Sequence, residues 1–246
     1  IQLWIVPKDQ TVTESRRSGQ DAKLQCQGCP LASNHGCYVA SYYVDAIQKA
    51  AWAGKKPKAK NRKQIAEFFR GRFVRFGAYG NPSRIPLSLV KLIAKESKGW
   101  TGYFHDWHRM TPTKAKAYGE FFMASCEPSN QAQAQKLGLR TFTTRTPEDK
   151  PHAGSIDCPS SKGVKCQDCR LCSGTTTRAK NVSIPVHGYQ AKSAGKAIAW
   201  SRTYSARSLA PLHSSPFGSW QHACNASQHS NITSQAYKLG FFCVLC

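Results

Sequence analysis

Acidic residues and long apolar runs are both scarce in this chain of 246 residues. No apolar run approaches the roughly 18 to 20 residues that a helix needs to cross a bilayer, so we expect no membrane span. Only 13 aspartates and glutamates stand against 35 lysines and arginines, which leaves a formal charge of +22. This imbalance favours a nucleic acid or another polyanion as the partner. No helix-turn-helix, zinc-finger or aromatic recognition signature is present, so we expect such binding to be weakly sequence-selective.

The chain still has enough apolar residues to bury a core. Hydrophobic residues make up 40% and aromatic residues 11%, too many for a chain that is disordered throughout. No acidic residue follows Asp168, and the apolar periodicity is lost beyond about Ser201. We therefore expect an α/β metal-binding domain over residues 1–197. Residues 198–246 would form an irregular basic C-terminal appendage that is poorly ordered or wrapped over the domain.

Eleven cysteines cannot all pair within one chain, because their number is odd, and seven of them fall into two tight groups. The first cysteine group is Cys26, Cys29 and Cys37, and the second is Cys158, Cys166, Cys169 and Cys172. Thiolates two residues apart can converge on one metal centre, whereas disulfides between such close neighbours would constrain little. We therefore expect metal in both groups and a reducing compartment, either the cytoplasm of a host cell or a virion. The remaining cysteines are expected to be small buried hydrophobes or spare thiols: Cys126, Cys224, Cys243 and Cys246.

The spacing of the cysteines leaves two kinds of metal open. The run Cys166-x-x-Cys169-x-x-Cys172 repeats the spacing of bacterial ferredoxins and favours an iron–sulfur cluster, with zinc as the alternative. The three thiols of the first group could hold three irons of a four-iron cluster and leave one iron open to a ligand. The alternative there is a zinc site that His35 completes as the fourth ligand.

Apolar patterns along the middle of the chain alternate between strand and helix. Strands are predicted over residues 1–6, 73–79, 99–104, 121–126, 139–145 and 181–187, and helices over 38–52, 87–97, 113–120 and 129–138. Repeated βα units require parallel pairing with right-handed crossovers, which predicts an α/β fold with a parallel sheet or a partial TIM-like barrel.

In such folds the functional groups collect after the carboxyl ends of the strands. That rule selects the turn Gly77-Ala-Tyr79-Gly80-Asn81, the residues His105, Asp106, Trp107 and His108, the pair Cys126 and Glu127, and Arg145. The glycines could let a ligand approach the backbone, or they could simply make the turn into the next helix. The two histidines could bind metal or move protons, although loop histidines often do neither.

Residues 49–75 form the densest basic segment, with ten lysines and arginines against Glu67 alone. Its phosphate-binding candidates are Lys55, Lys56, Lys58, Lys60, Arg62 and Lys63. The alternative is a solvated surface. The interleaved aromatic residues Phe68, Phe69, Phe73 and Phe76 fit a core-facing stripe better than a base-stacking platform.

Several of these pieces, taken in order, resemble an uncharacterised group of phage and mobile-element proteins that is similar to divergent radical S-adenosylmethionine enzymes. The resemblance is carried, across roughly residues 24–188, by Cys26-x-x-Cys29-Pro, Gly36-Cys37-Tyr38-Val39, Arg75-Phe-Gly-Ala-Tyr-Gly-Asn-Pro82, Trp100-Thr-Gly-Tyr-x-His-x-Trp107, Met123-Ala-Ser and the second cysteine group. Seven residues separate Cys29 from Cys37, whereas the superfamily usually has Cys-x-x-x-Cys-x-x-Cys.

The resemblance implies that the first cysteine group holds a four-iron cluster whose open iron binds S-adenosylmethionine. The residues expected beside that cofactor are Gly77, Tyr79, Gly80, Asn81 and His105. The second group would hold an auxiliary cluster. The predicted function is a radical S-adenosylmethionine-like enzyme that acts on a nucleic acid or a phosphate-bearing substrate. The alternative is a non-catalytic, zinc-stabilised protein that binds nucleic acid or builds a phage particle.

Overall fold

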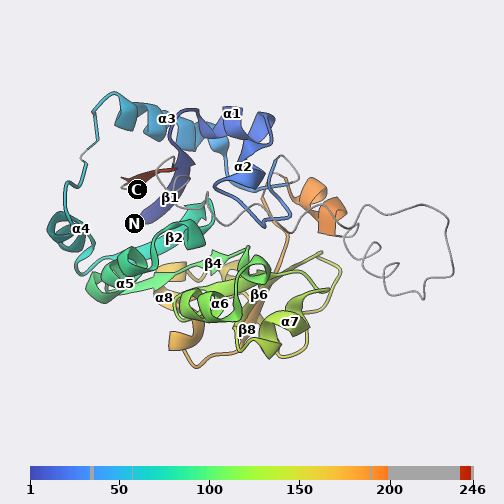
Figure 1. Ribbon diagram of the computed structural model, residues 1–246. Helices are drawn as coiled ribbons and strands as arrows, with labels where there is room; N and C mark the ends of the chain where they lie inside the picture. Colours follow the sequence, from blue (N-terminus) through green and yellow to red (C-terminus); the bar gives the residue numbers. More distant parts are fainter. Residues whose placement is uncertain (34–35, 57, 189, 199–238, 245–246) are drawn as a thin grey trace.

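The computed structural model describes residues 1–246 except 34–35, 57, 189, 199–238 and 245–246 (Figure 1). Its strands are β1 (Gln2–Pro7), β2 (Phe73–Tyr79), β3 (Gly99–Thr101), β4 (Tyr103–Phe104), β5 (Met123–Cys126), β6 (Thr141–Arg145), β7 (Ser155–Asp157), β8 (Asn181–Pro185) and β9 (Leu239–Val244). Its α-helices are α1 (Val12–Arg17), α2 (Gln20–Lys23), α3 (Ser41–Trp52), α4 (Arg62–Phe69), α5 (Leu87–Glu96), α6 (Pro112–Gly119), α7 (Gln131–Lys136) and α8 (Cys166–Cys169).

The strands form two sheets in which neighbouring strands run parallel, apart from one pair. The first sheet has the order β3-β2-β1-β9 and the second β4-β5-β6-β8-β7, and only β1 and β9 pair in an antiparallel way. Strands and helices alternate from β2 to β6. The predicted α/β class with a parallel sheet is therefore confirmed. The described strands do not close into a barrel, since β9 and β7 end the two sheets.

The predicted strand over residues 99–104 is divided at Gly102 into β3 and β4, and this division joins the two sheets. β3 pairs with β2, while β4 pairs with β5. The amide of Gly102 donates to the carbonyl of Cys172 at 2.8 Å, so a residue of the second cysteine group lies at the joint. A Cβ at Gly102 would lie 2.8 Å from the ring of Phe122, and only glycine fits there without a shift.

One face of the parallel strands is buried against helices. The core cluster joins Val74 and Phe76 of β2 and Phe104 of β4 to Val90 and Ile93 of α5. It also contains buried side chains from the neighbouring helices and turns, namely Trp107, Ala115, Tyr118, Phe122 and Ala134. Figure 1 shows α5, α6 and α7 on the same side of these strands. Side chains alternate between the two faces of a strand, so the residues between these apolar ones point the other way.

The basic segment contains a helix that the sequence analysis did not predict. In α4, the side chain of Asn61 accepts a hydrogen bond from the amide of Gln64 and caps the helix. Phe69 is buried in the core, and Phe68 packs against it with the guanidinium of Arg72 4.9 Å from its ring centre. The aromatic stripe of this segment therefore faces the core, as the preferred interpretation expected.

The amino-terminal part of the chain also contains helices that were not predicted. Thr11 and Glu14 form a capping box at the start of α1, in which each side chain accepts a hydrogen bond from the other residue's backbone amide. This Thr-x-x-Glu signal was present in the sequence.

Most of the predicted appendage, residues 199–238 and 245–246, lies outside the described residues. The described part of it, β9, pairs with β1 over six residues. In the described chain, no helix is long and apolar enough to cross a membrane.

The core between α6 and the strands should dominate the stability of the fold. Phe122 is fully buried and contacts Phe76 at 5.2 Å and Tyr118 at 6.4 Å between ring centres. We expect Phe122→Ala to lower the free energy of unfolding by about 3–5 kcal/mol, because it leaves a cavity that the packed neighbours cannot fill. Urea unfolding would measure the loss. Tyr42→Ala, which removes an exposed ring on α3, is the control and should change stability by no more than about 0.5 kcal/mol.

Candidate functional site

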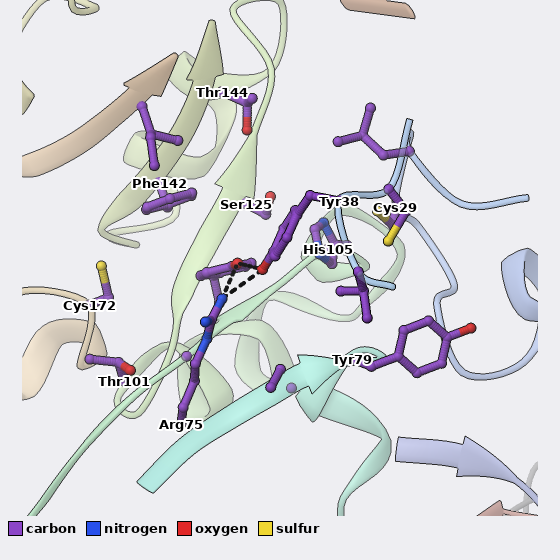
Figure 2. Close-up of a pocket in the computed structure, with 18 of the residues that line it drawn as sticks. Cys29, Tyr38, Arg75, Tyr79, Thr101, His105, Ser125, Phe142, Thr144 and Cys172 are labelled. Atoms are coloured by element: carbon purple, nitrogen blue, oxygen red, sulfur yellow. Dashed lines mark hydrogen bonds between the residues drawn. The ribbon is translucent and has the colours of Figure 1, made fainter. Parts of the chain in front are cut away.

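A cavity of about 240 Å³ opens on the face of the strands opposite the helical core (Figure 2). Most residues that line it on β2 and on the run from β3 to His105 alternate with core residues, although Ala78 and Gly102 line it as well. The other strand and strand-end residues that line it are Arg75, Gly77, Tyr79, Gly80, Thr101, Tyr103, His105, Ser125, Phe142, Thr144, Ile184 and Val186. Because successive side chains of a strand point to opposite faces, these strands have one apolar face that packs against the helices and one face of polar and apolar side chains that a ligand can reach.

Both cysteine groups contribute to this one cavity. The thiol-bearing residues that line it are Cys26, Cys29 and Cys37 from the first group and Cys158, Cys166 and Cys172 from the second. Figure 2 shows Cys29 and Cys172 on opposite sides of the cavity, with Arg75 between them. The spacing of the cysteines predicts the two groups separately but does not predict that both line one cavity.

In the first cysteine group Cys26 is buried, Cys29 and Cys37 are half-buried, and the thiols are close enough to influence one another. Burial is the main reason that the pKa of Cys26 is raised, and the thiols of Cys29 and Cys37 raise it further. The same two causes, burial first and then Cys37, raise the pKa of Cys29 to about 12. Free thiols here are therefore protonated at neutral pH and need a cation to become thiolates. His35, the proposed fourth zinc ligand, lies outside the described residues.

The turn after β2 holds the first cysteine group in place. Asn81 is buried and binds the backbone of the loop. Its backbone amide donates to the carbonyl of Gln25 at 2.6 Å, and its side-chain amide donates to the carbonyl of Gln27 at 3.0 Å. Asn81 thus acts beneath the loop that carries the thiols, while Gly77, Tyr79 and Gly80 line the cavity.

The glycines of this turn are required by the protein itself. Gly80 has a φ of +80°, and a Cβ there would lie 2.6 Å from the carbonyl oxygen of Ile5. Gly77 has a φ of +63°, and its Cβ would lie 2.7 Å from the carbonyl oxygen of Gly80. Close approach of the backbone to a ligand is therefore not needed to explain them.

The second cysteine group is held by a buried arginine. Nη1 of Arg140 donates to the carbonyls of Leu171 and Gly174, each at 2.8 Å, and Nη2 donates to that of Lys180 at 2.6 Å. Burial raises the pKa of Cys172 to about 12, and the nearby thiols of Cys158, Cys166 and Cys169 add to the rise. The four thiols of the group therefore lie near one another.

The thiols line the cavity without forming a compact site for a single ion. In the part of the chain that the structure describes, no three His, Cys, Asp or Glu side chains are grouped so that they could hold one metal ion. A four-iron cluster is larger than one ion, so its thiolates lie farther apart than the ligands of zinc.

Arg75 occupies the floor of the cavity between the two cysteine groups. Its Nη2 donates to the hydroxyl of Tyr38 at 2.6 Å and to that of Tyr103 at 3.5 Å, and the two hydroxyls are 2.8 Å apart. Tyr38 and then Tyr103 raise the pKa of Arg75, so its guanidinium remains charged. Neither the arginine nor the tyrosines were singled out as site residues from the sequence, although Tyr38, Arg75 and Tyr103 all lie within the motifs that carry the family resemblance.

The residues that were predicted to collect after the carboxyl ends of the strands have different environments. His105 lines the cavity, and burial lowers its pKa to about 4; Asp106 opposes this change and His108 adds to it. Its Nδ1 is buried without a hydrogen-bond partner among the described residues. A second, smaller cavity lies beside the first and is lined by His105, His108, Cys126 and Glu127 among others.

The remaining residues of this predicted set, Asp106, Trp107 and Arg145, form hydrogen bonds and an ion pair within the protein. Asp106 accepts a hydrogen bond from the hydroxyl of Ser83 at 2.7 Å, and the indole of Trp107 donates to the carbonyl of Ser125 at 2.9 Å. Arg145 forms an ion pair with Asp157 and donates to the carbonyls of Thr146 and Asp149.

The six basic candidates for phosphate binding lie on the surface around the start of α4. All are exposed except Lys56, which is half-buried. The described chain contains two ion pairs, Arg70 with Glu96 and Arg145 with Asp157, so none of the six forms an ion pair there. They do not line the cavity.

Comparisons with protein-family models, curated proteins and solved structures gave no match to this chain.

The half-buried His105 should make stability depend on pH. Its pKa is about 4 in the folded protein and about 6.5 in an unfolded chain, so between these values the unfolded state binds more protons. Acidification from pH 7 to pH 4 should therefore favour unfolding, and the effect should level off below pH 4. We expect His105→Asn to make the dependence of unfolding free energy on pH less steep in this window. Urea unfolding at several pH values would measure the change.

The matched control is His187→Asn, which removes an exposed imidazole that also lines the cavity. Equal pH dependence in wild type and His105→Asn would show that the pKa of His105 is the same in the folded and unfolded states.

Proposed function

We propose that this protein is an iron–sulfur, radical S-adenosylmethionine-like enzyme that acts on a nucleic acid or another phosphate-bearing substrate. The proposal rests on one observation: thiols of both cysteine groups line one cavity, on the face of the parallel strands opposite the helical core. A purely structural zinc site is closed by its protein ligands and gains nothing from facing a cavity. Thiols that surround a ligand-sized space are instead suited to a cofactor that reacts with a bound molecule.

The chemistry of the donors fits an iron–sulfur cluster on each side of the cavity. Thiolates are the usual ligands of such clusters, and the first group supplies three while the second supplies four. Burial disfavours these thiolates in the metal-free protein, so metal binding would release protons and add to the stability of both loops. When bound, a four-iron cluster with an open iron supplies an electron for the reductive cleavage of S-adenosylmethionine.

The protein's own residues would position and shield this chemistry. Asn81 fixes the loop of the first group, and Arg140 fixes that of the second. Phe142, Ile184 and Val186 give the cavity apolar walls that exclude water from reactive species. His105 is neutral at pH 7, so its imidazole could accept a proton from a bound molecule without first losing one.

The exposed basic residues support a nucleic acid as the partner. Lys55, Lys58, Lys60, Arg62 and Lys63 are exposed to solvent, and none of them forms an ion pair among the described residues. They also support a second candidate function, a zinc-stabilised protein that binds nucleic acid without catalysis, because that function needs only charge and closed metal sites.

Metal analysis should separate the two candidate functions. After anaerobic purification we expect about four irons and about four sulfides for each occupied cysteine group, and cleavage of S-adenosylmethionine once the protein is reduced. Replacing Cys26, Cys29 and Cys37 by alanine should abolish that cleavage and leave the iron of the second group. Cys126→Ala removes a buried thiol outside both groups and should leave the iron content unchanged. Stoichiometric zinc without iron or sulfide would refute the enzyme and support the alternative.

Binding of duplex DNA should depend strongly on salt. Each lysine or arginine that contacts a phosphate releases counterions, so the logarithm of affinity should fall with the logarithm of salt by about 0.9 per contact. We expect replacement of all six basic candidates, Lys55 to Lys63, by glutamine to reduce this slope and to leave the metal content intact. Fluorescence anisotropy over a salt series would measure it.

The control for that experiment removes six exposed lysines from other surfaces. These are Lys91, Lys95, Lys114, Lys116, Lys136 and Lys150. An equal reduction of the slope in both variants would assign the binding to net charge. An unchanged slope in the variant that lacks the six basic candidates would show that this basic segment is an ordinary solvated surface.

A further inference from the structure

Arg75 presents hydrogen-bond donors to the cavity that no group of the described residues takes up. Its side chain is half-buried on the face of β2 opposite the helical core. Only Nη2 donates hydrogen bonds within the described residues, to the hydroxyls of Tyr38 and Tyr103. Within the described residues, Nε and Nη1 donate to no other group. Because a guanidinium carries five N–H donors in a planar fork, the remaining ones are available to a ligand with paired oxygens.

Other buried arginines of this protein are used differently. Arg16 donates to the carbonyl of Val39 at 2.9 Å, and Arg140 and Arg145 each donate to two or more carbonyls of neighbouring loops. Arg145 also has Asp157 as its counter-ion. Arg75 has neither a carbonyl nor a carboxylate partner in the described chain. The free nitrogens of Arg75 are not among the buried, unpartnered side-chain atoms of the described residues, so they face the cavity and are open to an anionic ligand.

The walls around Arg75 are planar and apolar. The ring of Tyr103 stacks on that of Phe142 with 4.6 Å between centres and an angle of 5°, and Tyr38 stacks on His187 at 5.7 Å. Ile184 and Val186 complete this side of the cavity. A volume of about 240 Å³ is near the lower end of ligand pockets and suits a small planar molecule or a single unit of a polymer, but not a duplex.

The charge of the cavity limits the charge of the ligand. Arg75 is the only lysine or arginine among the described residues that line it. One positive charge balances one negative charge. A carboxylate and a phosphodiester each carry a single charge, whereas a phosphate monoester carries about −1.5 to −2 at pH 7.

We infer that Arg75, Tyr38 and Tyr103 form a subsite for a singly charged oxyanion, a carboxylate or a phosphodiester, that is attached to a planar body. The subsite lies between the two cysteine groups, so a molecule anchored there places its body in the space between them (Figure 2). The inference deepens the proposed function, on which it rests for the claim that this molecule is the substrate. The anion binding itself needs no metal.

Three probes separate the charge, the body and the source of the oxyanion. Benzoate carries a carboxylate on a planar ring, benzamide has the same ring without the charge, and the dinucleotide dTpdT carries one phosphodiester beside planar bases. We expect benzoate or dTpdT to bind the full-length protein by isothermal titration calorimetry, and benzamide to bind at least about tenfold more weakly. The tighter of the two anionic probes identifies the source. Inorganic phosphate lacks the planar body and should bind more weakly than that probe.

Variants test whether Arg75 is responsible. Arg75→Gln should weaken the tighter probe at least about tenfold, and Arg75→Lys should weaken it less, because lysine keeps the charge and loses the fork. Tyr38→Phe and Tyr103→Phe remove the hydroxyls that orient the guanidinium and should weaken binding without loss of fold. Arg109→Gln, which removes an exposed arginine outside the cavity, is the control and should have no effect.

Equal binding of benzoate and benzamide, or probe binding that Arg75→Gln and the two tyrosine variants leave unchanged, would overturn the subsite. Loss of iron in Arg75→Gln with unchanged probe binding would also overturn it, because Arg75 would then neutralise the thiolates of the second cysteine group instead. Metal content and S-adenosylmethionine cleavage decide the proposed function, and Arg75-dependent binding decides the subsite. Each can therefore fail while the other holds.

Discussion

The burial of one face of the parallel strands determines what the other face can do. Val74 and Phe76 of β2 pack with Phe104 and Phe122 under α5 and α6, and none of these four side chains is more than 1% exposed. Since successive side chains of a strand point to opposite faces, this packing turns Arg75 and Gly77 toward the cavity. A slip of one residue in β2 would place the arginine in the helical core. The hydrophobic packing thus fixes the register on which every cavity residue of the strands depends.

The two cysteine groups are brought to this face by polar contacts of the backbone. The loop of the first group rests on Asn81 at the end of β2, and Gly28 lies so close to β4 that a Cβ there would be 2.9 Å from the carbonyl oxygen of His105. The loop of the second group is bound at the joint between the sheets through Gly102 and Arg140. Irregular loops have no ladder to satisfy their carbonyls, so side-chain amides and a guanidinium take that role.

The sequence was sufficient to predict the local elements but not which distant segments contact one another. The strands over 73–79 and 139–145 and the helix over 87–97 were predicted to within about two residues, because each has a clear apolar period. The high charge of residues 49–75 concealed α4, although its phenylalanines were assigned to the core. β9 pairs with β1 from the far end of the chain, and no local pattern predicts such a contact. Cysteine spacing likewise indicates which thiols share a loop, whereas the shared cavity depends on the sheets between them.

Charge acts in this protein at two distances, and the two have different consequences. The exposed lysines around α4 act through water, where salt screens a charge within about 10 Å, so they can attract a polyanion but cannot select one chemical group. Arg75 is half-buried in the cavity, where the hydroxyls of Tyr38 and Tyr103 accept hydrogen bonds from its guanidinium. A charge held in this way discriminates by geometry and by the cost of leaving it unpaired. A polymer drawn to the surface would therefore still need a unit small enough to enter the cavity and an oxyanion placed to meet Arg75.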